Sequence, residues 1–348
     1  MSALPPRTGL LAGGNWIIDH VKLLDGWPPQ DALANILSQS WGNGGSPYNI
    51  LKDLSLLHAA FPLAAVGLVG DDADGHRILD DCRAHKIDTA QLRLIPGAPT
   101  SYSDVMTDTT TGRRTFFHQR GANALLSPAH FDFTTTRAKI FHLGYILLLD
   151  DLDRLDTDGL PRANAVLRRA RAAGLLTSLD CVSEHSDRFR TVVTPTLPEV
   201  DILFVNDFEA EKLTGIPLRP AGASAHSGLN RPAAESAVRA LLALGVRRHV
   251  ILHFPEGACA ASAGSDSITW QPSVRIPAAS IAGAAGAGDA FAAGCLLALH
   301  DDRPLADALE LGVCTAAVSL LHATCSESIR PLADTLVFGR SHGFRPLP

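Results

Sequence analysis

The sequence lacks the features that mark membrane, secreted and nucleic-acid-binding proteins. No apolar run approaches the length of a membrane span, and Met1–Gly14 has no cationic segment followed by a long apolar stretch. Asp and Glu outnumber Lys and Arg, 36 to 30, and the formal net charge is -6, so no basic face is available to neutralise a nucleic-acid backbone. We therefore expect a cytoplasmic protein that binds neither nucleic acid nor a membrane.

Cysteine pairs and two common nucleotide-binding motifs are also missing. The six cysteines are scattered, none forms a Cys-x-x-Cys pair, and most have apolar neighbours, which is typical of buried thiols in a reducing compartment. We expect neither disulfides nor zinc. There is no Gly-x4-Gly-Lys-Ser/Thr and no Gly-x-Gly-x-x-Gly, so neither a P-loop enzyme nor a dinucleotide-binding fold is expected.

The chain does contain enough apolar residues to form a large core. It has 348 residues, of which 46% are hydrophobic. Four short runs, apolar on both faces, alternate with helical patterns and predict parallel strands covered by helices on both sides: Lys139–Leu143, Leu175–Leu179, Val200–Val205 and His249–Leu252. The intervening helical patterns end at Gly174 and Gly245, which are suited to the left-handed position after a helix. The fold class is therefore α/β.

The first third of the chain has a different pattern. Four mixed polar and apolar stretches, rich in residues that favour strands, predict a small separate sheet: Asn15–Leu24, Ala34–Trp41, Ser101–Thr107 and Thr115–Gln119. Between them, Ala64–Val69 and Ile78–His85 predict a strand and a helix of the main layers. The small sheet is therefore discontinuous in sequence.

The segment Gly283–Asp289 carries the sharpest chemical signal. Its glycines precede a run of small and apolar residues, Ala290–Leu299, that suits a buried helix. Free N–H groups at a helix N-terminus favour an anion, and glycine lets the backbone approach it, so this turn is a candidate phosphate cradle. Asp289 beside it would repel phosphate unless it takes a proton from an attacking hydroxyl. The alternative is an acidic residue that only complements the helix dipole.

Several segments, in order, resemble the ribokinase-like (PfkB-type) carbohydrate kinases over Gly13 to about Leu332. The matching motifs are the strand Asn15–Asp19, Gly44-Gly45-Ser46-Pro47-Tyr48-Asn49, Val69-Gly70-Asp71-Asp72-Ala73-Asp74-Gly75, Asn206-Asp207-Phe208-Glu209, and Gly286-Ala287-Gly288-Asp289 with Ala290-Phe291. The resemblance implies a single three-layer domain over residues 1–348, with a mostly parallel sheet between helices. The small discontinuous β sheet would be a lid, built from segments of about 15–41 and 101–120.

The resemblance also implies roles for particular residues. Asp289 would be the catalytic base, and N–H groups from Gly286, Ala287 and Gly288 would help form the anion hole. Sugar binding would fall to four residues: Asp19, Gly44, Gly45 and Asn49. Asn206 and Glu209 would face the ATP phosphates and Mg2+, with Glu209 holding the metal through water, and His253 and Gly257 would border the nucleotide. Without the resemblance, the favoured interpretation of Asn206 is a cap on a helix that starts with Asp207.

Two further candidates come from strand alternation. His118 and Arg120 alternate with Phe116 on one face of a small-sheet strand, so they are candidates to close over a substrate. The alternative is an exposed edge strand that carries charge to prevent pairing with other chains.

Some positions depart from the family pattern. Gly283-Ala284 replaces the usual Asp-Thr, a turn that helps to hold a monovalent cation in many relatives, so the resemblance does not imply such a cation here. His253-Phe254-Pro255 replaces the usual Thr-x-Gly beside adenine. Cys181-Val182-Ser183-Glu184, which follows Asp180, lacks the Arg that keto-sugar-acid kinases of this family tend to carry nearby, so the resemblance favours a neutral sugar over a sugar acid. The resemblance thus implies an ATP- and Mg2+-dependent sugar kinase that forms a homodimer. Two alternatives stay open: a nucleoside kinase in which Trp16, Trp41 or Tyr48 stacks a base, and a non-catalytic sensor.

Overall fold

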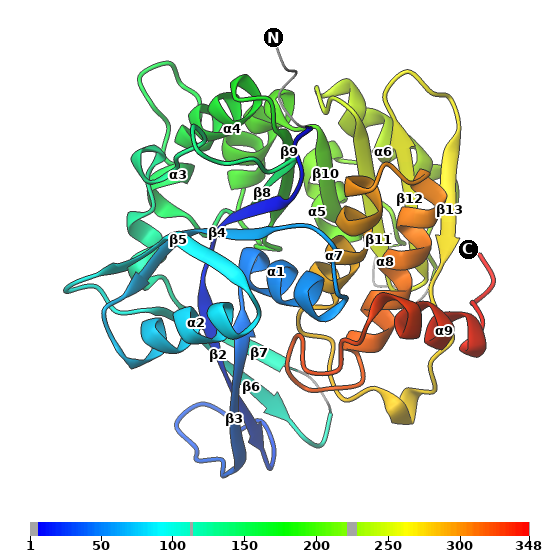
Figure 1. Cartoon of the computed structure of the whole chain (residues 1–348). Coiled ribbons are helices and arrows are strands. Elements are labelled where there is room, and N and C mark those ends of the chain that lie inside the picture. Colours follow the sequence, from blue (N-terminus) through cyan, green and yellow to red (C-terminus); the bar gives the residue numbers. More distant parts are fainter. Residues whose placement is uncertain (1–5, 112–113, 221–227, 348) are drawn as a thin grey trace.

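The computed structural model describes residues 6–111, 114–220 and 228–347. Its centre is a nine-stranded sheet in which all neighbouring strands are parallel, except that β12 is antiparallel to β11 and to β13 (Figure 1). The strands lie in the order β13 (Ile268–Pro272), β12 (Gly257–Ser262), β11 (His249–Phe254), β10 (Ile202–Asn206), β9 (Leu176–Cys181), β8 (Ile140–Ile146), β1 (Leu10–Gly14), β4 (Leu63–Gly70), β5 (Ile87–Ile95).

Helices cover both faces of this sheet. One face packs against α1 (Ser46–Leu56), α2 (Ala73–Ala84), α7 (Ala287–His300), α8 (Leu305–Ser319) and α9 (Leu332–His342). The other packs against α3 (Asp150–Asp153), α4 (Arg162–Ala172), α5 (Asp207–Thr214) and α6 (Arg231–Ala243). Successive strand residues enter opposite cores, as Phe204 and Val205 do, because side chains alternate along a strand. The predicted three-layer arrangement is confirmed.

A second sheet of four strands lies at one end of the large sheet (Figure 1). Its order is β3 (Ile36–Gly44), β2 (Ile17–Leu24), β6 (Ser101–Asp108), β7 (Arg114–Gln119). These strands correspond to the four stretches predicted from the first third of the sequence, although residues 112–113 of that region lie outside the described residues. The discontinuous small sheet is confirmed.

The predicted strands and helix ends of the main layers are also found. The four apolar runs form β8 to β11, and Gly174 and Gly245 have φ angles of +86° and +115°, as the left-handed position requires. The antiparallel strands β12 and β13 were not predicted. β12 has the sequence GACAAS, which lacks the β-branched and aromatic residues that indicate a strand, and it is buried because it packs between helices α6 and α8.

Two findings bear on the compartment predictions. All six cysteines are free thiols and all are buried. In the described part of the chain, none of the helices combines the length and the apolar character that crossing a membrane requires.

Candidate active site

The glycine-rich turn delivers free N–H groups at the start of α7. Gly286 precedes the helix with a φ of +70°, and an added Cβ there would lie 2.6 Å from the Cβ of Cys325, so both the turn and the close approach require glycine. Among the described residues, the N–H groups of Gly288 and Asp289 have no acceptor, whereas that of Ala287 donates to the Ala284 carbonyl at 3.3 Å. The helix start can therefore bind an anion through at least two N–H groups.

Asp289 lies in the first turn of α7 and is 2% exposed. Its Oδ2 accepts hydrogen bonds from the Asn49 amide at 2.7 Å and the Tyr145 hydroxyl at 2.6 Å. Its Oδ1 is buried and has no hydrogen-bond partner in the described structure. Burial raises the pKa of Asp289, while the hydrogen bonds from Tyr145 and Asn49 lower it. The carboxyl is thus fixed by one oxygen and available through the other.

Asp19 faces the same centre from β2 of the small sheet. Burial, followed by repulsion from Asp289, raises the pKa of Asp19 to about 7. Gly44, at the end of β3, leaves room for this carboxylate, since an added Cβ would lie 2.6 Å from Asp19 Oδ1. Gly45 then starts α1, which carries Asn49. These four predicted sugar ligands meet around Asp289, and Asn49 contacts it directly.

His118 belongs to the same face of the small sheet. Asp19, Ser103 and His118 are in register across β2, β6 and β7, and the Ser103 hydroxyl lies 3.1 Å from His118 Nδ1. His118 Nε2 is buried without a partner, and burial lowers the pKa of the ring to about 4, so the ring is neutral. A buried polar atom without a partner is unfavourable until a ligand satisfies it.

Arg120 is held elsewhere. Its guanidinium donates to the Leu147 carbonyl and forms an ion pair with Asp150, each at 3.0 Å. Its charge is therefore already compensated at the carboxyl end of β8.

Asn206 and Glu209 form a complete capping box at the start of α5. Asn206 Oδ1 accepts from the Glu209 N–H, and Glu209 Oε2 accepts from the Asn206 N–H, each at 2.9 Å. Ser183 and the Asn206 amide donate to Glu209 Oε1. Glu209 is 3% exposed, and burial raises its pKa to about 7. The capping interpretation of these residues is thus realised in the structure.

This arrangement bears on whether Mg2+ fits. Both Glu209 oxygens already accept hydrogen bonds, and no group of three or more His, Cys, Asp or Glu side chains in the described ranges is arranged to bind a metal directly. Asp180, at the end of β9, has its pKa raised by burial and by repulsion from Glu209 and Asp289. A buried carboxyl that two other buried carboxyls repel fits a nearby hydrated divalent cation, the form in which Mg2+ binds in many phosphate sites.

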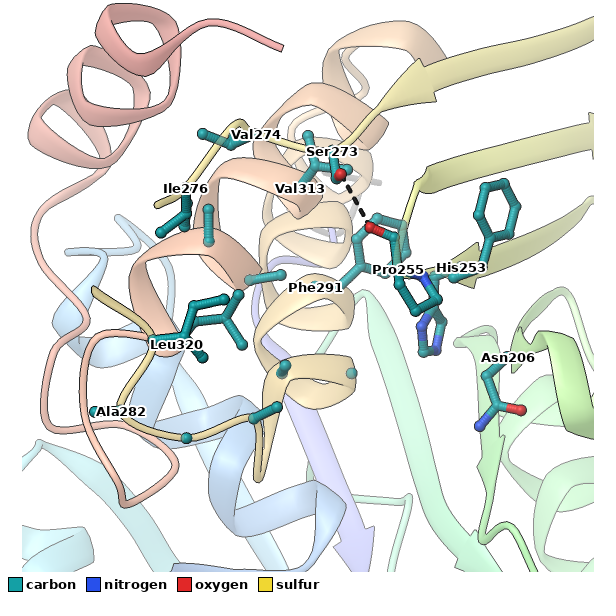
Figure 2. A pocket seen from close by; sticks show the side chains of 18 of the residues that line it. Asn206, His253, Pro255, Ser273, Val274, Ile276, Ala282, Phe291, Val313 and Leu320 are labelled. Carbon is teal, nitrogen blue, oxygen red and sulfur yellow. Dashed lines mark hydrogen bonds between the residues drawn. The ribbon is translucent and has the colours of Figure 1, made fainter. Parts of the chain in front are cut away.

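A cavity of about 750 Å3 lies beside these carboxylates. Figure 2 shows Asn206 and His253 at one side and Ile276, Ala282 and Leu320 at the other. Five predicted residues line it: Asn206, His253, Gly257, Ala287 and Gly288. Burial lowers the pKa of His253 to about 4, and its ring packs 5.2 Å from that of Phe291. The cavity is therefore mostly apolar, with the anion-binding helix start in its wall.

Sequence reasoning missed several polar residues of this centre. Tyr145 follows the buried stretch of β8 at its carboxyl end, a position that could have indicated it. Arg114 alternates with Phe116 and His118 on β7 and lines the cavity, and it has no hydrogen-bond or ion-pair partner among the described residues. The buried Asp53, one helical turn beyond Asn49, gave no sequence signal.

An open α/β sheet with a glycine-rich helix start, a buried carboxylate beside it and a cavity at the carboxyl ends of its strands defines a phosphotransferase-type site. Residues 10–331 match the family model described as pfkB family carbohydrate kinase. The chain belongs to this family, and it is a carbohydrate kinase by that membership.

Curated relatives agree with this assignment. A probable chloroplastic fructokinase-6 of Arabidopsis thaliana is 26% identical over 303 residues, which cover 84% of this chain and 70% of the relative. An ATP-dependent ribose-1-phosphate kinase of Halopiger xanaduensis is 28% identical over 199 residues, or 57% of this chain and 61% of the relative.

Solved structures confirm the ribokinase-like fold. An Arabidopsis thaliana ribokinase complexed with ribose and ATP has a TM-score of 0.75 at 20% identity, covering 96% of this chain and 99% of the other. A Burkholderia thailandensis nucleoside kinase in complex with inosine has a TM-score of 0.74 at 18% identity, covering 97% and 100%.

Proposed function

We propose that this carbohydrate kinase transfers the γ-phosphoryl group of ATP to a hydroxyl of a small neutral sugar, with Asp289 as the general base. The sugar hydroxyl gives its proton to Asp289, its oxygen bonds to the γ-phosphorus, and the bond from that phosphorus to the β–γ bridging oxygen breaks to release ADP. The N–H groups of Gly288 and Asp289 stabilise the negative charge on the transferring group.

The observation that carries this proposal is the position of Asp289. Its Oδ2 is held by Asn49 and Tyr145, its Oδ1 is free of partners, and it stands at a helix start whose N–H groups are unbonded beside a large cavity. A carboxylate that only capped the helix would need neither two side-chain donors nor a neighbouring cavity.

On the sugar side, we assign hydroxyl binding to Asp19 and His118. Asp19 can accept from two adjacent hydroxyls, and the partnerless Nε2 of His118 lies on the same face of the small sheet. Gly44 brings the backbone close to Asp19, Gly45 brings it close to Asn15, and Asn49 orients the base. Arg120 is left out because Asp150 already pairs with it. The small sheet would act as a lid that keeps water from the transferring phosphoryl.

On the nucleotide side, we assign the cavity to ATP. His253 and Gly257 would border the base, and Asn206 would face the phosphates. Bound Mg2+ would supply positive charge to the phosphates. Glu209, together with Asp180, would hold its water ligands, since both carboxyls lack a neutralising cation.

The three residues suggested to stack a base, Trp16, Trp41 and Tyr48, do not support the nucleoside kinase alternative. Trp16 and Tyr48 are fully buried in the core, and the exposed Trp41 is covered by the Arg77 guanidinium at 4.6 Å. None of the three lines the cavity.

A turnover assay on Asp289→Asn tests the proposed function. ADP release should be measured with fructose, ribose, ribose 1-phosphate and nucleosides, because these cover the substrates of the related kinases and the alternative. Asp289→Asn should keep the fold and ATP binding, and lower turnover on the best acceptor by roughly two to four orders of magnitude. Near-wild-type turnover in the folded variant would refute the base, and no turnover of any acceptor by the wild type would favour the sensor.

We also propose that the small sheet pairs two copies of this chain in the cytoplasm. Its faces and edges carry large exposed side chains, among them Leu37, Trp41, Phe116 and Phe117. Apolar area of this kind on a sheet with two open edges is unfavourable in a monomer. Sedimentation of the wild type should give a dimer, and Phe117→Glu should give a monomer. A monomeric wild type at micromolar concentration would contradict this pairing.

A further inference from the structure

One arginine of the small sheet faces the cavity and has no role in the proposed mechanism. Arg114, the first residue of β7, is half-buried and lines the cavity. It is in register with Thr107 on β6, and Thr107 is in register with Leu23 on β2, so the three form one row across the sheet. Thr107 and Leu23 line the cavity as well. This row is therefore part of the wall that the small sheet contributes to the cavity.

The same face of the small sheet carries the two residues that we assign to the sugar. Asp19 and Leu23 are four residues apart on β2, and His118 and Arg114 are four residues apart on β7. Because side chains alternate along a strand, each of these pairs points to one face. The sugar-binding residues and the cavity wall are thus neighbouring parts of a single surface.

Cys325 connects Asp19 with the turn before α7. Its thiol donates to Asp19 Oδ2 at 3.9 Å. It also packs closely on Gly286, where an added Cβ would lie 2.6 Å from the Cys325 Cβ. An anion on the N–H groups of Gly288 and Asp289 therefore lies close to Asp19. This is the end of the cavity at which a phosphoryl group would pass to a sugar hydroxyl.

Arg114 brings a positive charge to this end of the cavity. Burial lowers its pKa, whereas Cys325 and Asp19 raise it, and a guanidinium keeps its proton at any ordinary pH. Within the described residues, the guanidinium has neither a hydrogen bond nor an ion pair. A cation that is partly removed from water without a partner is unfavourable until an anion binds it.

The described lining of the cavity has two other charged residues. Asp207 is paired with Arg219 at 2.7 Å, so its charge is compensated. Arg345 comes from the C-terminal segment, where its N–H donates to the Ser273 carbonyl at 2.9 Å. The Ser273 hydroxyl in turn donates to the Pro255 carbonyl at 3.0 Å. Arg345 therefore stands beside the segment that we assign to the nucleotide base.

We propose that Arg114 binds the γ-phosphoryl group of ATP from the side of the small sheet, while the N–H groups of Gly288 and Asp289 bind it from the start of α7. The guanidinium donates to the γ-phosphoryl oxygens, and the contact strengthens as negative charge spreads over them in the transition state. Because Arg114 belongs to the lid, a third phosphate favours the closed position of the small sheet. This inference rests on the proposed function, since it needs ATP in the cavity and Asp289 as the base.

The test compares nucleotides with and without the third phosphate. Calorimetry with Mg2+ present should use ADP and a non-hydrolysable ATP analogue that has an imido group between the β- and γ-phosphorus. Arg114→Met should weaken binding of the analogue about 10- to 100-fold, the range expected for hydrogen bonds lost between charged groups, and leave ADP binding within about twofold. Arg114→Lys keeps the charge but loses the paired N–H groups, so its loss should be smaller. In Arg114→Met, kcat should fall by about 100-fold or more.

Arg345→Met is the matched control, because it removes another arginine that lines the cavity and has no side-chain partner in the described ranges. It lies beside the base rather than the third phosphate. Its ratio of analogue affinity to ADP affinity should therefore equal that of the wild type.

An unchanged ratio of these affinities in Arg114→Met would overturn the proposal. A loss confined to sugar binding would mean that Arg114 only neutralises Asp19, and a loss confined to ribose 1-phosphate relative to ribose would mean that it binds a phosphate of the acceptor; either result would also overturn it. If Asp289→Asn turns over normally, the proposed function itself fails, whatever the ratio. Should Arg114→Met not fold, Arg114→Gln decides by the same ratio.

Discussion

The two halves of the site are built in opposite ways. One half is a cluster of four carboxyls, the acid centre, which consists of Asp19, Asp180, Glu209 and Asp289. Burial raises the pKa of each. The adjoining cavity is mostly apolar. Its one lining carboxylate, Asp207, is bound by Arg219 at 2.7 Å. The acid centre is therefore unfavourable until cations or hydroxyls satisfy it, whereas the cavity can bind a ligand by shape alone.

The largest effect should come from breaking the acid centre at Asp19. Asp19→Ala removes the carboxylate that we assign to the sugar hydroxyls, and it should weaken sugar binding by more than about 100-fold, the range expected when hydrogen bonds to a charged group are lost. ATP binding should stay unchanged, because Asp19 does not line the cavity. Calorimetry with each ligand measures this directly, and sugar affinity equal to that of the wild type would remove Asp19 from the site.

A change at Glu209 should alter the Mg2+ requirement without altering sugar affinity. Glu209→Gln keeps the shape of the capping box but removes the charge, so the Mg2+ concentration needed for half-maximal activity should rise roughly tenfold, as for other residues that act on a metal through its ligands. Sugar affinity should be unaltered. A Mg2+ titration that superimposes on that of the wild type would leave Glu209 with a capping role only.

The acid centre also predicts how stability depends on pH. The pKa values of Asp19 and Glu209 are about 7 in the folded protein, above the ordinary values of 3.8 and 4.5. Between about pH 4 and 7 the folded protein keeps protons that the unfolded chain has lost, so stability should fall as pH rises through that window. Without ligands, Tm should decrease from pH 5 to 7.5.

Matched variants sharpen this expectation. Asp19→Asn should flatten the fall in Tm, because it removes one of the groups that hold a proton. In Asp132→Asn the slope above pH 5 should not change, since the pKa of Asp132 is lowered by the Thr134 side chain. A Tm that rises over the same range would contradict the raised pKa values.

The contrast between the two halves also explains what the sequence could reveal. Periodicity located β8 to β11 and the small sheet, because alternation and apolar runs are local signals. Asp289, Asp19 and Gly44 stood in recognisable motifs, and the structure brings them together. Tyr145 on β8 contacts Asp289 on α7 across 144 residues of sequence, a long-range contact that no local pattern encodes. A cap by Asn206 was the alternative to ligand binding, and the structure shows that cap together with a reciprocal bond from Glu209 that was not predicted.

The smallest effect should come from the apolar half, at His253. This ring packs against Phe291 and is neutral, because burial lowers its pKa to about 4. His253→Ala should therefore raise the KM for ATP only about three- to tenfold, the range expected for a lost aromatic contact of about 0.5–1.5 kcal/mol, with kcat and the sugar KM unchanged. The ATP KM of the wild type should also stay flat between pH 6 and 8, since His253 does not titrate there.

The control for this prediction is His249→Ala. His249 is on the same strand β11, but it is bonded to Ser262 and lies outside the cavity lining, so its substitution should leave the ATP KM unaltered. Equal effects of the two substitutions would mean that His253 acts only through the packing of β11, and the cavity would then need another wall for the nucleotide base.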